Sequence, residues 1–252
     1  MKNKNFLLGL ILFLLGMAGV FSLLAMSLDE FLTEEVRKQL NGISEDQLRW
    51  LSLINPAVLV IISVVVGVAL HKKVKLGVPL INGLLEGEFA SGLVVQQLKF
   101  GIGGGVLAGI LILVVSAIFE PFLPQAYLEL GDRFDPPLVV RFLYGGITEE
   151  ILLRFGLMTL FVWIGAKIAR GLSNLVFWIS IVLSSIIFGI GHLPAVLQLI
   201  PEPDFSLVVY IIFANSLGGI VFGWLYWKKG LEAAMIAHIL THVTMLLGEW
   251  LS

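Results

Sequence analysis

The chain has 252 residues, of which 58% are hydrophobic and only 13% are charged. Soluble domains average about 25% charged residues, so this composition excludes an ordinary soluble protein and a disordered one. The sequence has no cysteine, which excludes disulfides, iron–sulfur clusters and thiolate chemistry. The formal net charge of −2 gives no electrostatic reason to expect a nucleic-acid partner.

Seven apolar runs are each long enough for a helix across a bilayer, which needs about 20 apolar residues. Their approximate ranges are 6–27, 52–71, 100–119, 138–165, 174–193, 206–227 and 231–248. The stretch 78–99 predicts a short interfacial helix or an eighth span. Between the first two spans, Asp29 and Ser44 are predicted helix N-caps, and Ser44 with Gln47 fits a capping box. We expect an all-α fold, a polytopic transmembrane helix bundle, with residues 1–252 in a single integral membrane domain.

Lysine and arginine are distributed unevenly between the connections. Most of them fall on one side of the predicted bundle: Lys2, Lys4, Lys72, Lys73, Lys75, Lys99, Lys167, Arg170, Lys228 and Lys229. The opposite connections carry many of the acidic residues. Because basic loops stay on the cytoplasmic side, this alternation predicts a cytoplasmic N-terminus and an external C-terminus. The expected location is the plasma membrane of a prokaryote.

Ionisable residues inside the spans are informative, because each costs about 2.5–3.5 kcal/mol at the bilayer centre. The fourth span carries Glu149, Glu150 and Arg154 near its middle. Glu150 and Arg154 are four residues apart and can pair along one helix face, whereas Glu149 lies about 100° around the helix. Two neighbouring carboxylates in such different surroundings fit a catalytic base and its structural partner. The alternative is a buried ion-pair cluster that only locks helices together.

Three of the four histidines also lie in late spans. His192 follows Phe188 by four residues near the end of the fifth span, and His238 and His242 share one face of the seventh. The last spacing matches two zinc ligands of a metalloprotease helix, but Ile239 stands where the catalytic glutamate would follow. Each histidine alone also fits a packed core residue. Together with the acidic pair, they predict a hydrolytic site in a water-accessible pocket.

Three motifs carry a resemblance to a known family. In chain order they are Glu149-Glu150-x-x-x-Arg154, Phe188-x-x-x-His192 and His238-x-x-x-His242. Together they resemble the ordered motifs of the CAAX-protease and bacteriocin-processing family, also called the Abi or type II CAAX prenyl endopeptidase family. The resemblance covers about residues 142–246, inside a motif-bearing core of about 138–248. The family usually has Asn or Asp at the position of His242.

The resemblance implies an intramembrane endopeptidase that hydrolyses peptide bonds with a glutamate-activated water. In that reaction Glu149 would be the general base, and His192 would position the water. His238 would stabilise the oxyanion. Glu150 and Arg154 would orient the site.

The departure at His242 allows two roles. It could donate a further hydrogen bond to the oxyanion, or it could join His192 and His238 as a third zinc ligand. The favoured mechanism requires no cofactor, and zinc is the alternative. The implied partners are the lipid bilayer and a peptide or protein substrate, prenylated or membrane-anchored.

Other protein classes stay open at this point. A bis-histidine haem protein would use His192 with His238 or His242, a proton-coupled transporter would use the buried glutamates and histidines, and a membrane scaffold would use none of them chemically. At 1.5 Å per residue, Glu149 lies about 24 Å from the inner end of its span and His238 about 10 Å. The two can meet only if helices tilt or the bounds shift. The membrane face to which the site opens is not determined by the sequence.

Overall fold

All regular secondary structure in the described residues is helical. The computed structural model describes residues 2–27, 42–88, 90–131, 136–200 and 202–251. Seven of the described helices are long and apolar enough to cross a membrane. They are Asn3–Ala25, Glu45–Val74, Ser91–Phe122, Leu138–Ile168, Asn174–Gln198, Phe205–Lys228 and Leu231–Leu251. This confirms the predicted all-α bundle and supports an integral membrane protein.

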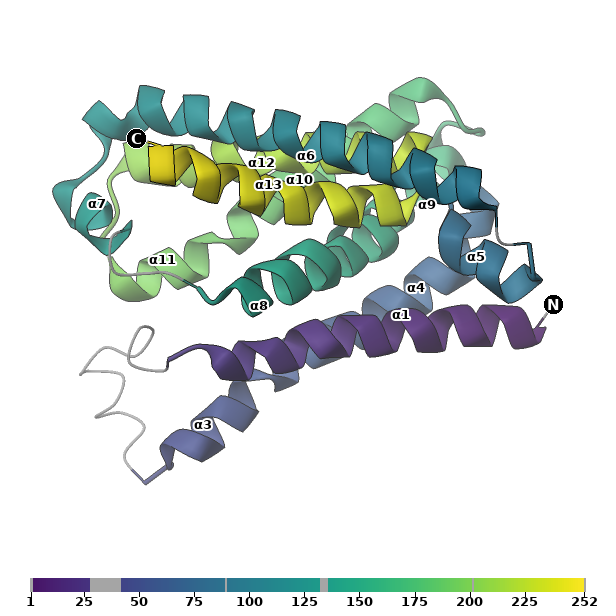
Figure 1. Cartoon of the computed structure of the whole chain (residues 1–252), viewed down its shortest axis with the longest axis horizontal. Helices are drawn as coiled ribbons and strands as arrows, with labels where there is room; N and C mark the ends of the chain where they lie inside the picture. Colours follow the sequence, from purple (N-terminus) through teal and green to yellow (C-terminus); the bar gives the residue numbers. More distant parts are fainter. Residues whose placement is uncertain (1, 28–41, 89, 132–135, 201, 252) are drawn as a thin grey trace.

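Shorter elements make up these spans and their connections (Figure 1). The first three spans and the connections between them contain α1 (Lys2–Ser22), η1 (Leu23–Ala25), α3 (Glu45–Ser52), α4 (Ile54–Leu70), η3 (His71–Val74), α5 (Pro79–Glu86), α6 (Ser91–Phe119) and η4 (Glu120–Phe122). After α7 (Gln125–Gly131), the fourth span contains α8 (Leu138–Val140), the π-helices η5 (Arg141–Glu149) and η6 (Ile151–Met158), and α9 (Thr159–Ile168). The last elements are α10 (Asn174–Gly191), α11 (Leu193–Leu199), α12 (Phe205–Lys228) and α13 (Leu231–Leu251).

The third span begins earlier than predicted. The stretch 78–99 divides into the short helix α5 and the first turns of α6, so the described residues contain no eighth span. Gly87 ends α5 with a φ of +75°, which glycine adopts without strain. The predicted capping box is present, since Ser44 Oγ accepts from Gln47 N and Ser44 N donates to Gln47 Oε1. The predicted N-cap Asp29 lies outside the described residues.

The fourth span lies between two layers of helices (Figure 1). α1 and α4 contact it on one side, and α10, α12 and α13 contact it on the other. The hydroxyl of Thr148 donates to the carbonyl of Gly16 in α1 at 2.8 Å. A Cβ added at Gly156 would lie 2.5 Å from the Cβ of Ser63 in α4. The span that carries the charged residues is therefore enclosed on both sides.

Three glycines on one face of α6 bring it into close contact with α13. A Cβ added at Gly105 would lie 2.5 Å from the carbonyl oxygen of Ala237, and Cβ atoms at Gly101 and Gly109 would meet α13 side chains at 2.5 and 2.6 Å. Thr241 Oγ1 donates to the carbonyl of Gly105 at 3.2 Å. Because small residues let helix backbones approach closely in a membrane, this stripe fixes the position of α13 and of its two histidines.

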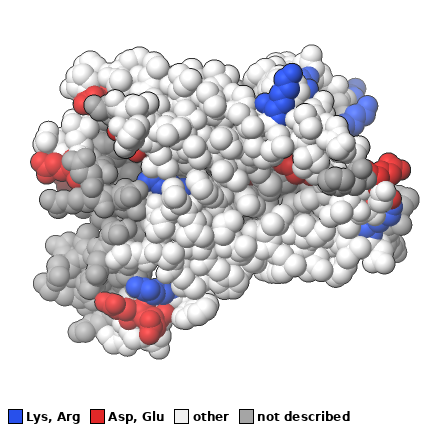
Figure 2. All heavy atoms as spheres, in the orientation of Figure 1, with Lys and Arg blue, Asp and Glu red and all other residues white. Residues whose placement is uncertain are grey.

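Charged side chains gather toward the two ends of the bundle, and most of the face between them is uncharged (Figure 2). The N-terminus, α5 and the end of α9 lie at one end, and α3, α7, α11 and the C-terminus lie at the other (Figure 1). We call the first the lysine-rich end, because it carries Lys72, Lys73, Lys75, Lys167, Arg170, Lys228 and Lys229. We call the second the lysine-poor end. The structure thus gathers at one end the connections that were predicted to be cytoplasmic.

Glu149 and His238 meet, although the predicted bounds placed them at different depths. One reason is the pair of π-helices, which have more residues per turn than an α-helix and advance less per residue. The other reason is that α13 begins inside the protein. Leu231 is fully buried, and its N–H donates to the carbonyl of Gly77. The start of α13 is therefore recessed from the lysine-rich surface.

Gly105→Ala tests the close contact between α6 and α13, and Gly103→Ala is its matched control. A Cβ at Gly103, on the same helix, would meet no atom within 4 Å. We expect Gly105→Ala to lower the free energy of unfolding by about 1–3 kcal/mol, as overpacking does. Gly103→Ala should not lower it, because alanine favours a helix over glycine. Thermal unfolding in detergent measures both, and equal melting temperatures would contradict the close contact.

Candidate functional site

Glu149 and Glu150 lie where the two π-helices of the fourth span meet. η5 ends at Glu149, and Glu150 separates it from η6. Within this stretch the hydroxyl of Thr148 donates to the carbonyl of Leu143, five residues earlier, at 3.2 Å. A wider turn separates neighbouring side chains by less than the 100° of an α-helix. Both carboxylates consequently reach α13. π-Helical turns are rare and are often found at functional sites.

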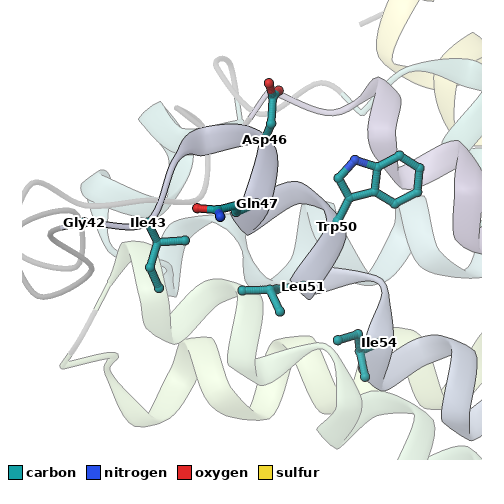
Figure 3. A pocket seen from close by; sticks show the side chains of 7 residues that line it. All are labelled: Gly42, Ile43, Asp46, Gln47, Trp50, Leu51 and Ile54. Carbon is teal, nitrogen blue, oxygen red and sulfur yellow. The ribbon is translucent and has the colours of Figure 1, made fainter.

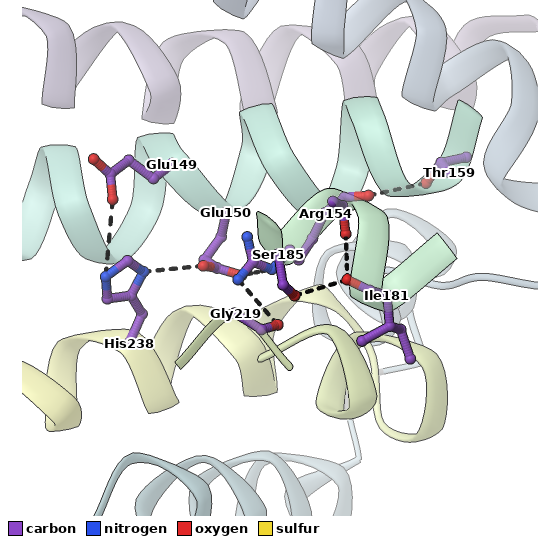
Figure 4. A network of polar contacts seen from close by, with 9 residues as sticks. Glu149, Glu150, Arg154, Thr159, Ile181, Ser185, Gly219 and His238 are labelled. Atoms are coloured by element: carbon purple, nitrogen blue, oxygen red, sulfur yellow. Dashed lines mark hydrogen bonds and ion pairs between the residues drawn. The ribbon is translucent and has the colours of Figure 1, made fainter. Parts of the chain in front are cut away.

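Glu150 is the centre of a buried ion network (Figure 4). Its Oε2 lies 3.2 Å from Nε of Arg154, and its Oε1 lies 2.9 Å from Nδ1 of His238. The side chains of Glu150 and Arg154 have no exposed surface. An ionised carboxylate can only accept a hydrogen bond, so the second contact requires a proton on Nδ1 of His238. Glu150 therefore pairs with Arg154, as the spacing predicts, and also orients the histidine.

The guanidinium of Arg154 is held by two further helices. Its Nη2 donates to the carbonyl of Gly219 in α12 at 3.2 Å. Its central carbon lies 5.0 Å from the ring centroid of Phe188 in α10 and 5.5 Å from that of Phe222 in α12. Aromatic ring faces attract a buried cation electrostatically, in addition to the attraction from a carboxylate. The arginine thus joins the fourth span to α10 and α12.

The imidazole of His238 lies in a stack of three rings. Phe222 covers one face, with centroids 4.5 Å apart and ring planes at 21°. His242 covers the other face at 5.2 Å and 17°. Gly145 leaves room for this arrangement, because a Cβ there would lie 2.9 Å from Nε2 of His242. The stack fixes the plane of the His238 ring, whose Nδ1 edge meets Glu150.

Glu149 faces the opposite edge of the same imidazole. Its Oε2 lies 3.8 Å from Nε2 of His238, which is too long for a direct hydrogen bond. The Glu149 side chain is 18% exposed, whereas that of Glu150 is fully buried. Glu149 is thus the carboxylate that has exposed surface. A carboxylate beside an oriented imidazole can hold a water between them.

His192 stands at the break between α10 and α11, where the fifth span continues through Pro194. Its Nδ1 lies 2.9 Å from the carbonyl oxygen of Phe188, so Nδ1 is the donor and Nε2 of the neutral ring is an acceptor. The Phe188 ring meets His192 edge-on at 4.7 Å and His238 edge-on at 5.7 Å. Phe188 therefore links His192 to the network around Glu150.

The residues that were predicted as zinc ligands do not converge on one point. Within the described ranges, no three histidine, aspartate or glutamate side chains are placed to hold a metal ion. The rings of His238 and His242 are nearly parallel, and nitrogen lone pairs lie in the ring plane, so these two point side by side. This arrangement does not fit the tetrahedral coordination that zinc prefers.

An open hollow lies away from this network (Figure 3). It is lined at the lysine-poor end by the start of α3 and the residues on either side, including Ile43, Asp46, Trp50 and Ile54. Among the described residues that line it, Asp46 is the only titratable one. These residues include no nucleophile paired with a base, so the candidate site is the buried network inside the bundle.

The sequence did not identify the residues that hold the network in place. Phe222 and Gly219 come from α12, for which no motif was recognised. The adjacent glycines Gly145 and Gly146 precede the acidic pair, and a Cβ at Gly146 would also meet α13, at Ile239. Their position one turn before two adjacent carboxylates was the available signal for a close helix contact.

Comparison with known proteins bears on the motif-bearing part of the chain. Residues 135–244 match the model of the family described as type II CAAX prenyl endopeptidase Rce1-like. This match confirms the resemblance seen in the sequence: the motif-bearing segment, less than half of the chain, is similar to a family of CAAX-type membrane peptidases. No curated protein and no solved structure matches the chain.

Arg154→Met tests the ion network, with Arg170→Met as a control at an exposed arginine. We expect Arg154→Met to cost about 3–5 kcal/mol of stability, because it leaves the Glu150 carboxylate buried without its cation. The double variant Glu150→Gln/Arg154→Met should recover part of that loss. Denaturant unfolding in detergent measures the free energy of unfolding of the original protein, the two single variants and the double variant. Additive effects of the two substitutions would contradict a direct pairing.

Proposed function

We propose that the chain is an intramembrane endopeptidase in which Glu149 activates the attacking water. The observation that carries the proposal is the difference in burial and bonding between the two carboxylates. Glu150 is buried and bonded to Arg154 and His238, whereas Glu149 is partly exposed and faces the free edge of the same imidazole. One carboxylate is thereby committed to structure, and the other is available to accept a proton.

The first step is attack by water on the scissile carbonyl. A water beside the 3.8 Å gap between Glu149 and His238 can hydrogen-bond to both. Glu149 removes one proton as the water oxygen bonds to the carbonyl carbon. The acceptor Nε2 of His192 is suited to position that water. The product of this step is a tetrahedral oxyanion, and the proton resides on Glu149.

The second step breaks the carbon–nitrogen bond. Glu149 returns its proton to the leaving amine, and the other product is a carboxylic acid, which then loses its remaining proton to the free amine or to water. Until then the oxyanion needs donors, which are effective in a dry site because they need no reorganisation. This role requires His238 to carry a proton on each nitrogen, so that it donates to Glu150 through Nδ1 and to the oxyanion through Nε2. While Glu149 holds the proton from water, the formal negative charges of Glu150 and the oxyanion then offset the positive charges of this histidine and of Arg154.

His242 is proposed as an additional oxyanion donor rather than a metal ligand. It lies one helix turn from His238, with the two rings stacked. Its Nδ1 is buried without a hydrogen-bond partner among the described residues. An imidazole in this place can supply the donor that Asn supplies elsewhere in the family. The reaction then requires no cofactor.

The substrate and orientation are proposed at the level that the family and the charge pattern support. The substrate is a peptide or protein segment at the membrane, prenylated or membrane-anchored. The lysine-rich end faces the cytoplasm, with the N-terminus on that side and the protein in a prokaryotic plasma membrane. A haem bound through His238 is less well supported, because both nitrogens of this residue face carboxylates.

Glu149→Gln tests the proposed base. The amide keeps the shape of the side chain but cannot accept the proton from water, so we expect cleavage of membrane-anchored peptides to fall by at least about 10²–10⁴-fold. Glu86→Gln, at an exposed glutamate at the end of α5, is the matched control and should cleave normally. Mass spectrometry of peptide products in proteoliposomes measures both. Unchanged cleavage by folded Glu149→Gln would disprove the mechanism.

His242→Asn separates the donor role from the metal role. Asparagine keeps a hydrogen-bond donor but removes an imidazole ligand. Without a metal, we expect cleavage within about tenfold of the original rate, whereas His242→Ala should lose about 10²–10³-fold, as removal of an oxyanion donor does. Chelator treatment should change neither rate. Loss of activity in His242→Asn together with zinc in the purified protein would favour the metal route.

A further inference from the structure

Burial along α13 changes at the level of His238. Toward the lysine-rich end the helix is enclosed, and Leu231, Ala234 and Ala237 have no exposed surface. Toward the lysine-poor end none of the residues 242–251 is buried. The same helix is therefore sealed on one side of the site and open on the other.

The fourth span changes in the same direction. Arg154, Phe155 and Met158, on the lysine-rich side of the acidic pair, have no exposed surface. On the other side of Glu149, residues 141–144 are all partly exposed. Residues 141–144 of the fourth span and residues 242–251 of α13 are thus partly or fully exposed on the same side of the site.

Side chains of α12 and of the fourth span pack together on the lysine-rich side of the site. Phe222 covers the inner face of the His238 ring and is 1% exposed. One turn further along α12, Tyr226 is fully buried, and its Oη lies 2.8 Å from Oγ1 of the buried Thr159. Together with Arg154, these buried side chains lie between the site and the lysine-rich end. The other face of the His238 ring is covered by His242, which is itself partly exposed.

We infer that substrate enters the site from the lysine-poor end of the bundle, past His242, and that the site is closed toward the lysine-rich end. The part of this inference that concerns substrate depends on the proposed peptidase function. In the proposed orientation, the lysine-poor end faces away from the cytoplasm. The substrate class is then a peptide segment already exposed on the outer face of the membrane, so a translocation step must precede cleavage.

The absence of native cysteine makes access directly measurable, because each introduced thiol is the only one in the chain. Glu149→Cys and His242→Cys place a thiol at the site, and neither needs activity to be informative. Lys73→Cys and Glu202→Cys, at exposed residues of the lysine-rich and lysine-poor ends, report which face a reagent reaches. A membrane-impermeant maleimide is added to sealed vesicles of known and opposite orientations, and gel filtration confirms that each variant is folded.

We expect the thiols of Glu149→Cys and His242→Cys to react in the vesicles in which Glu202→Cys reacts, and not in those in which Lys73→Cys reacts. Reaction with the Lys73→Cys face, with both faces or with neither face would overturn the inference. If Glu149→Cys fails to fold, labelling of His242→Cys alone still tests the inference.

A second measurement separates this inference from the proposed function. Membrane-anchored peptide is supplied to one face of proteoliposomes that hold the unmodified chain in a single orientation. One-sided labelling without any cleavage would leave the access route intact and count against the peptidase. Cleavage only from the lysine-rich face would support the peptidase and overturn the access route.

Discussion

The buried carboxylate of Glu150 is the constraint on which the rest of the site depends. A charge without exposed surface is costly in a membrane protein unless it is paired and hydrogen-bonded. One oxygen is ion-paired with Arg154 and the other is hydrogen-bonded to His238, so each carboxylate oxygen faces a polar partner. Because these partners come from the fourth span and α13, and Arg154 is also bonded to α12, the pairing fixes three helices relative to one another. The same contact turns the free edge of His238 toward Glu149.

Close helix packing makes this pairing geometrically attainable. Gly105 lets α13 approach α6, Gly145 makes room for the ring of His242, and Gly219 brings α12 near α10 while its carbonyl receives Arg154. In lipid there is little hydrophobic drive to bring helices together, so small residues and polar contacts carry much of the association. A stack of rings then holds His238 in one plane. Packing and electrostatics therefore support the same geometry rather than competing.

The sequence predicts the ingredients of the site better than their arrangement. Glu149, Glu150 and Arg154 are visible because charge is rare inside a span, and the helix count follows from apolar length. Their depth relative to His238 could not be derived, because the π-helices and the recessed start of α13 arise from tertiary contacts. The role of Phe222 was also hidden, since one more aromatic residue in an apolar helix carries no signal. The direction of access depends on burial, which a sequence does not contain.

The protonation of His238 tests most directly whether Glu150 orients the site. The chain has only four histidines, so nitrogen-15 labelling of histidine gives a spectrum simple enough to assign by single substitutions. The imidazole nitrogen shifts report which ring nitrogen carries a proton. The account predicts that Nδ1 of His238 is protonated in the unmodified protein and that Glu150→Gln changes its resonance more than that of His71. An unprotonated Nδ1 in the unmodified protein would contradict the account.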